Sequence, residues 1–214
     1  FAMQMANGAW GVTAATPGHV RIYREFGLTR IILANQLVGR QAIAYVAGEL
    51  ARDPEFDFYC LVDSARGIDL LEAGLAETPA GRPLQLLIEL GYAGGRSGVR
   101  DDAEALALAR RIAASPLLSL RGIEAFEGIV QGHDGDETRV GGLLHRIRSL
   151  GEAALDEGLF DGRPLLSAGG SSFFDLVADH LSAPAFDVVL RSGCYLVHDS
   201  RFYRDLIERL TVRS

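Results

Sequence analysis

The chain has 214 residues, of which 48% are hydrophobic and 23% are charged, and its formal net charge is −7. Such a chain can bury one sizeable core, which excludes wholesale disorder. All 21 basic residues are arginines and they are scattered, so we expect neither nucleic acid nor an anionic membrane surface as a partner.

Apolar runs typical of strands alternate with helical patterns along the chain. The runs lie at 8–16, 30–36, 56–64, 84–92, 118–128, 164–172 and 186–197. A helical pattern follows each run, at 17–27, 40–51, 65–77, 101–115, 138–157, 173–181 and 200–210. Strands that are apolar on both faces are typical of a parallel sheet covered by helices.

Seven strand–helix units predict an α/β fold, namely a (β/α)8 TIM-type barrel that lacks its first strand. A complete barrel has about 250 residues, and the missing unit would precede Phe1, where the chain reads as though it begins inside an element. We expect both ends to be truncations, so that residues 1–214 form one partial barrel domain. An open doubly wound sheet is the alternative, although no GxGxxG turn follows a first strand to support it.

Cysteine usage and hydropathy indicate the cellular compartment of the protein. Cys60 and Cys194 lie far apart in apolar runs and match no metal spacing, so we expect two reduced, buried thiols. No apolar run reaches the roughly 18–20 residues of a membrane span. We therefore expect a cytoplasmic protein without a membrane partner.

Polar residues and glycines gather where the predicted strands end, which is where a barrel places its functional groups. They are Asn35, Gln36, Asp63, Glu89, Gly91–Gly98 with Arg96, Glu127, Gly169–Ser172 and Arg191–Tyr195. Their common position predicts that they meet at one end of the barrel.

Two of these loops have the composition of an anion site. Glycines let the backbone approach a ligand, and free N–H groups at a helix start bind a phosphate that hydroxyl groups can also contact. Gly169–Ser172 and Ser192–Cys194 therefore predict a phosphate site between the last two loops. Arg191 follows an apolar run, where a buried guanidinium needs an acceptor such as a pyridine nitrogen or a carboxylate.

The order of the motifs GAWGVTAAT, ILANQLVG, LVDS, GGRSGV, GIEAFEG, GGSS and LRSGCY resembles one family over nearly the whole chain. It is the family of D-serine dehydratases (deaminases) and D-threonine aldolases, pyridoxal-phosphate enzymes with an alanine-racemase-like N-terminal barrel. The resemblance implies a Schiff-base lysine N-terminal to Phe1, which would explain a chain without lysine. It also implies a C-terminal β-domain with a divalent metal, usually zinc, and a homodimer.

The resemblance assigns roles to single residues. Gly170 with Ser171, and Gly193 with Cys194, would hold the cofactor phosphate, and Tyr195 would lie close by.

Two arginines would face the rest of the cofactor. Arg191 would approach the pyridine nitrogen, and Arg96 the phenolic oxygen or the substrate carboxylate. The chain departs from the family's Tyr-x-Gly-His pattern with Phe126-Glu127-Gly128-Ile129, which puts any role of that tyrosine or histidine in doubt and leaves His133 as a substitute to consider.

The expected function is that of a lyase acting on small β-hydroxy D-amino acids, with D-serine going to pyruvate and ammonia as the first choice. Retro-aldol cleavage of D-threonine and racemisation are the alternatives within this class. A non-catalytic pyridoxal-phosphate-binding barrel and an unrelated phosphate-binding barrel are the alternatives outside it. Without a lysine, residues 1–214 alone are expected to be inactive.

Overall fold

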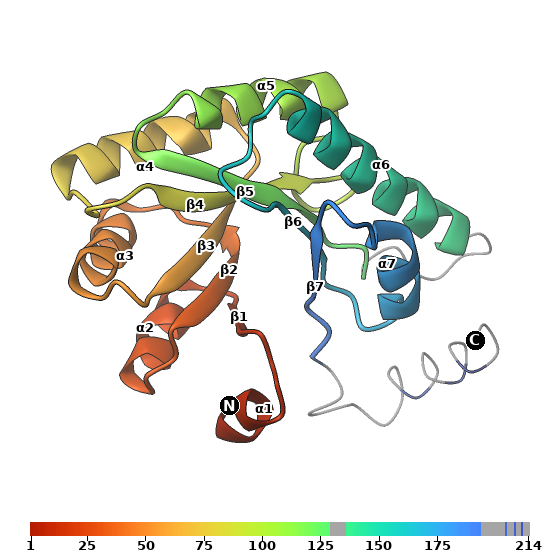
Figure 1. Cartoon of the computed structure of the whole chain (residues 1–214), viewed down its shortest axis with the longest axis horizontal. Helices are drawn as coiled ribbons and strands as arrows, with labels where there is room; N and C mark the ends of the chain where they lie inside the picture. The colour runs from red at the N-terminus through yellow and green to blue at the C-terminus, as the bar shows by residue number, and fades with distance from the viewer. Residues whose placement is uncertain (129–135, 194–203, 205–207, 209–210, 212–214) are drawn as a thin grey trace.

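The computed structural model is a curled parallel sheet of seven strands with helices along its outer side (Figure 1). It describes residues 1–128 and 136–193 together with residues 204, 208 and 211. The strands lie side by side in sequence order from β1 to β7. This is the arrangement of a (β/α)8 barrel that is short of one strand, so the predicted fold class is confirmed.

The elements follow the predicted alternation closely. The strands are β1 (Val12–Ala14), β2 (Arg30–Gln36), β3 (Asp57–Val62), β4 (Leu84–Leu90), β5 (Leu118–Ala125), β6 (Leu165–Ala168) and β7 (Asp187–Leu190). The helices are α1 (Ala2–Ala6), α2 (Pro17–Glu25), α3 (Arg40–Arg52), α4 (Ala65–Glu77), α5 (Asp102–Ala113), α6 (Asp136–Asp156) and α7 (Phe174–Leu181).

The first unit differs from the prediction. The short helix α1 is not predicted by the sequence pattern, and the first strand begins at Val12 rather than at residue 8. Gly8 explains part of the difference, because its φ of 88° turns the chain after α1 and is incompatible with an extended strand. The helix predicted at 200–210 falls almost entirely outside the described residues.

Alternation along the strands divides the core into two parts. Residues such as Phe58 and Cys60 belong to the large cluster between sheet and helices. A smaller cluster of Ile32, Tyr59, Leu61, Leu87 and Leu165 fills the inside of the curl. Both faces of the sheet are therefore apolar, as predicted, and Cys60 is a buried free thiol.

The inward positions turn polar toward the carboxyl ends of the strands. Glu89 on β4 is paired in register with Glu124 on β5, and Glu124 is paired with Ser167 on β6. Above the apolar inner cluster the fold thus places a polar layer, which forms the floor of the site described below.

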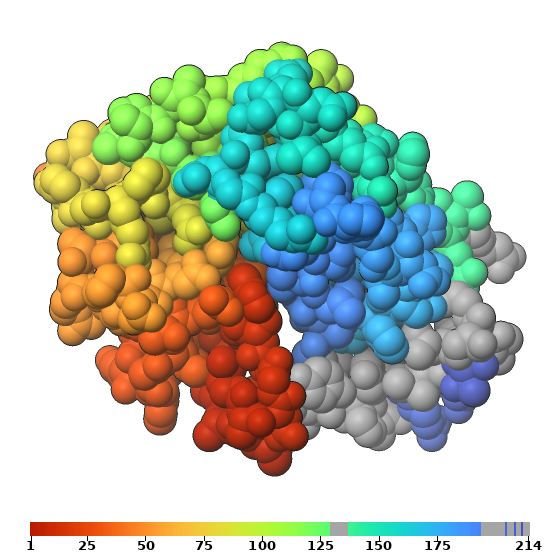
Figure 2. Space-filling view, viewed as in Figure 1, coloured from red at the N-terminus to blue at the C-terminus, as the bar shows by residue number. Residues whose placement is uncertain are grey.

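β1 and β7 are the two edges of the sheet. The space-filling view shows the N-terminal segment (red) and the segment around β7 (blue) on either side of a hollow (Figure 2). Among the described helices, none is both long and apolar enough to cross a lipid bilayer.

Candidate active site

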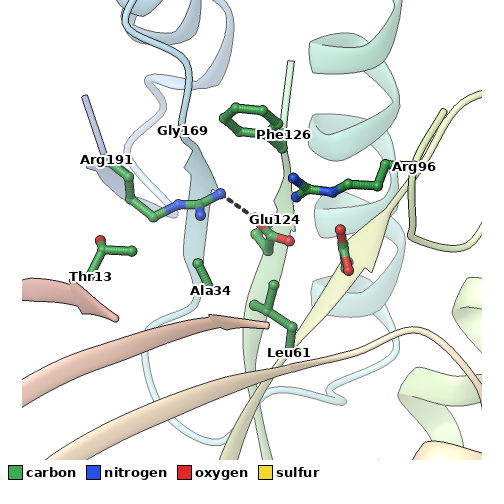
Figure 3. A pocket seen from close by; sticks show the side chains of 9 residues that line it. Thr13, Ala34, Leu61, Arg96, Glu124, Phe126, Gly169 and Arg191 are labelled. Carbon is green, nitrogen blue, oxygen red and sulfur yellow. Dashed lines mark hydrogen bonds and ion pairs between the residues drawn. The ribbon is translucent and has the colours of Figure 1, made fainter. Parts of the chain in front are cut away.

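A pocket of about 220 Å³ opens at the carboxyl ends of the strands, inside the curl of the sheet. Its lining comes from all seven strands or the loops that follow them: Thr13, Ala34, Leu61, Glu89, Arg96, Glu124, Phe126, Gly169 and Arg191. Active sites of (β/α)8 barrels are built at this end. Arg96 and Arg191, separated by 95 positions in sequence, reach toward Glu124 from opposite sides (Figure 3).

Arg191 is fixed by an ion pair with Glu124. The Nη2 group of Arg191 donates to Oε2 of Glu124 and, at 2.9 Å, to the carbonyl oxygen of Ala125, while Nε donates to Oγ of Ser167 at 2.9 Å. Both side chains are buried, with exposed fractions of 6% for Arg191 and 1% for Glu124. The acceptor that a buried arginine requires at this position is therefore a carboxylate of this chain.

Glu124 has one carboxylate oxygen left over. Oε1 is buried and has no hydrogen-bond partner within the described part of the chain. Burial raises the pKa of Glu124 to about 7, because Arg191 and Arg96 only partly offset the combined effect of burial and the neighbouring Glu89 and Glu127. Near neutral pH this carboxyl group can therefore either accept or donate a proton.

Glu89 differs from Glu124 in that both of its oxygens have donors. The side-chain amide of Gln36 donates to Oε2 and the hydroxyl of Ser97 donates to Oε1, each at 2.5 Å. Gln36 is the last residue of β2 and Ser97 lies in the loop after β4, so the Glu89 carboxylate connects these two parts of the chain. Its hydrogen bonds are satisfied without a ligand.

Arg96 is placed by an aromatic ring. Its guanidinium carbon lies 5.3 Å from the centroid of the Phe126 ring, within the range of a cation–π contact. The guanidinium stays on the pocket wall, where it can bind an anionic oxygen.

Glu127 organises the predicted phosphate loop. Its carboxylate is fully buried and accepts hydrogen bonds from the backbone N–H groups of Gly169 at 3.0 Å and Gly170 at 2.5 Å. These two amides of the loop therefore bind an internal carboxylate, and the phosphate site that the loop's composition predicts stays a prediction.

The two loops predicted to hold a phosphate are joined directly. The hydroxyl of Ser192 donates to the carbonyl oxygen of Gly170 at 3.2 Å, which connects the loop after β7 with the loop after β6. Ser171 precedes α7 by a few residues, and Gly193 is exposed. Cys194, Tyr195 and His133 lie outside the described residues.

Glu124 is a pocket residue that the sequence motifs do not single out, and Phe126 enters there only as a departure from the tyrosine of the family pattern. A signal for Glu124 exists, because a carboxylate within the apolar strand LRGIEA needs a partner wherever it is buried. Gly122, Glu124 and Phe126 also alternate, which points them to one face of β5. Across the described residues no group of three histidine, cysteine or acidic side chains could hold a metal ion.

Comparison with known proteins agrees with this geometry. Residues 2–200 match the family model of the alanine racemase N-terminal domain. The chain belongs to this family. The chain is 30% identical over 136 residues to a D-threonine aldolase from Arthrobacter sp. This match covers 64% of the chain and 35% of the relative.

Two solved structures share the alanine-racemase-type barrel. D-threonine aldolase from Filomicrobium marinum has a TM-score of 0.75 and 24% identity, covering 94% of this chain and 52% of the other. D-threo-3-hydroxyaspartate dehydratase from Delftia sp. HT23 has a TM-score of 0.70 and 21% identity, covering 96% of this chain and 52% of the other. The chain thus spans about half the length of these solved relatives and about a third of the curated one.

Proposed function

We propose that the chain is the cofactor-binding barrel of a pyridoxal-phosphate-dependent lyase for small β-hydroxy D-amino acids, with D-serine to pyruvate and ammonia as its reaction. The observation that carries the proposal is the pocket where Arg96, Arg191 and Glu124 converge at the carboxyl ends of the strands of an alanine-racemase-type barrel. The names of the relatives support it, since threonine and 3-hydroxyaspartate both carry a β-hydroxyl group. We further propose a homodimer, and a divalent metal such as zinc held outside residues 1–214.

The residues present fit pyridoxal phosphate in chemical type. Ser171 and Gly193 belong to loops that Ser192 joins, and these loops would hold the phosphate. Arg96 would bind the phenolic oxygen or the substrate carboxylate, and Phe126 offers an aromatic face. The buried Oε1 atom of Glu124 lacks the donor that a ligand would bring.

When bound, the cofactor supplies an electron-withdrawing ring that stabilises negative charge on the α-carbon of the substrate. This chain's own residues bind and orient it, because the sequence contains no lysine to anchor it covalently. The covalent anchor and the base that takes the α-proton would therefore come from outside residues 1–214.

One alternative has an observation in its favour. Cleavage of D-threonine is favoured by the 30% identity to a D-threonine aldolase. A non-catalytic pyridoxal-phosphate-binding barrel is a second alternative, of a different class. Racemisation is a third alternative within the proposed class.

Product analysis of the natural gene product, loaded with pyridoxal phosphate, tests the proposal. We expect D-serine to give pyruvate and ammonia, whereas aldol cleavage of D-threonine gives glycine and acetaldehyde and racemisation gives the enantiomer. Borohydride reduction followed by peptide mapping would locate the cofactor-bearing lysine. A protein that binds the cofactor and releases none of these products would support the non-catalytic alternative, and one that never binds it would overturn the proposal.

A further inference from the structure

The proposed function leaves the buried residue Glu127 without a role. Both of its carboxylate oxygens accept hydrogen bonds from the loop after β6, Oε2 from the N–H of Gly169 at 3.0 Å and Oε1 from the N–H of Gly170 at 2.5 Å. A carboxylate next to a predicted phosphate site opposes the binding of phosphate, because like charges repel. The loop must therefore gain something else from this side chain.

Glu127 and the glycine loop pack together without spare room. A Cβ on Gly170 would lie 2.5 Å from Oε1 of Glu127, and a Cβ on Gly128 would lie 3.1 Å from the Cα of Gly170. A Cβ on Gly169 would lie 3.2 Å from Cδ2 of Phe126. The carboxylate, the segment that follows β5 and the glycine loop are thus fixed to one another.

The backbone at Gly170 is also held from its other side. Its carbonyl oxygen accepts a hydrogen bond from Oγ of Ser192 at 3.2 Å. The N–H of Gly170 is therefore bound by the segment after β5, and its C=O by the loop after β7. With both groups held, the chain enters Ser171 and the start of α7 in a defined direction.

We propose that Glu127 is a positioning residue for the cofactor phosphate: its carboxylate fixes the peptide groups of Gly169 and Gly170, so that Ser171 and the start of α7 meet the phosphate. This inference rests on the proposed function. It also places the phosphate beyond the first two amides of the glycine loop, which the carboxylate keeps occupied. Donors that are oriented before the ligand arrives lower the cost of binding.

Positioning and a simple charge effect predict opposite results for Glu127→Gln. Removing a negative charge next to a phosphate site should by itself strengthen phosphate binding. An amide side chain, however, has a single oxygen to accept from an N–H and turns its NH₂ group toward the other N–H. If Glu127 acts by holding the loop, phosphate binding becomes weaker although a negative charge has been lost.

The test compares the binding of pyridoxamine 5′-phosphate and of pyridoxamine to the natural gene product prepared without pyridoxal phosphate. Neither probe has an aldehyde, so neither depends on a lysine. The dissociation constant of pyridoxamine divided by that of its phosphate measures the contribution of the phosphate group. We expect this ratio to fall by about tenfold in Glu127→Gln, the effect of losing one hydrogen bond to a charged group.

Two further measurements test the same contribution. Glu127→Asp keeps the charge but shortens the side chain by one methylene group, so it should also lower the ratio. Inorganic phosphate should compete less well with pyridoxamine 5′-phosphate in both Glu127 variants than in the wild type.

Glu49→Gln is the matched control, since Glu49 is also a buried carboxylate that accepts from two partners, Arg24 and Arg52, but on the helices α2 and α3. Its ratio should equal that of the wild type. An unchanged or larger ratio in Glu127→Gln, or an equal fall in Glu49→Gln, would overturn this inference and leave the proposed function standing. Absence of pyridoxamine 5′-phosphate binding to the wild type would overturn both.

If neither Glu127 variant folds, the wild type labelled with ¹⁵N-glycine decides. The amide proton shifts of Gly169 and Gly170 should stay nearly constant when pyridoxamine 5′-phosphate binds, because Glu127 keeps both hydrogen bonds. A large change at both glycines would show that the phosphate displaces the carboxylate, and would overturn the inference.

Discussion

At the scale of single residues, Gly170 shows how tightly the candidate site is assembled. A Cβ at this position would lie 2.5 Å from Oε1 of Glu127 and 2.8 Å from the Cα of Gly128. Both neighbours are constrained, because Glu127 is fully buried and Gly128 is backbone. A glycine is required here for close approach rather than for an unusual φ.

Gly170→Ala should therefore lower the free energy of unfolding by about 2 kcal/mol, since the buried carboxylate of Glu127 would lose backbone donors. Urea unfolding followed by circular dichroism measures this change. Gly142→Ala is the control, because Gly142 lies exposed on α6 and a Cβ added there would meet no atom within 4 Å. That variant should gain about 0.5–1 kcal/mol from its higher helix propensity. An equal decrease in the free energy of unfolding in both variants would contradict the close packing around Gly170 as the cause.

At the scale of elements, a buried ionic cluster joins α2 to α3. Arg24 donates to Glu49 at 2.9 Å and to Asp53 at 2.5 Å, and its guanidinium carbon lies 4.2 Å from the ring centroid of Phe56. Arg52 adds a second donor to Glu49. Burial alone would raise the pKa of Glu49, but the hydrogen bonds from Arg24 and Arg52 lower it overall.

At neutral pH, Arg24→Met should lower the free energy of unfolding by about 3 kcal/mol, because it leaves the buried carboxylate of Glu49 without its main partner. Arg40→Met is the matched control, since Arg40 pairs with Glu77 at the surface with side-chain exposures of 81% and 51%. Breaking that pair should lower the free energy of unfolding by less than about 1 kcal/mol. Thermal and urea unfolding of the two variants give the comparison, and similar costs would show that the cluster is not effectively buried.

The pH dependence of this cluster has a definite sign. The pKa values of Glu49 and Asp53 are lowered in the folded state, for Asp53 chiefly by the hydrogen bond from Arg24. Their stabilisation is therefore present above the ordinary carboxyl pKa and is lost as pH falls through the lowered values. The difference in the free energy of unfolding between wild type and Arg24→Met should accordingly become smaller as the pH is lowered.

At the scale of the whole molecule, the sheet ends in two edge strands within the described part of the chain. There, β2 to β6 pair on both sides, whereas β1 and β7 pair on one side only. The residues of β7 are also at least partly exposed, while those of β4 are almost all buried. Local opening should therefore be easiest at the two edges.

Hydrogen exchange followed by mass spectrometry should show the slowest amides in peptides from β3 to β5 and the fastest strand amides in β1 and β7. Equal protection of β7 and β4 at low protein concentration would contradict this order. Protection of the edges that rises with concentration would instead indicate that a second copy covers them, which is the behaviour expected of the proposed homodimer.

Several features of the protein follow from the sequence alone. The apolar strands and the helical periodicity between them predict seven parallel units, because both signals are local and repeat along the chain. The position of Arg96, Glu89 and Arg191 just at or after strand ends predicts that they share one end of the barrel, and all three line the pocket. The absence of lysine also requires no structure.

The tertiary structure decided which of these groups meet. Glu124 and Arg191 are 67 positions apart, and their pairing depends on the register of β5, β6 and β7 and on the curl of the sheet. The same register gives Glu127 the amides of the glycine loop and leaves one oxygen of Glu124 without a donor among the described residues. Local periodicity shows which face a residue occupies, but contacts across strands depend on long-range packing, which a local pattern does not contain.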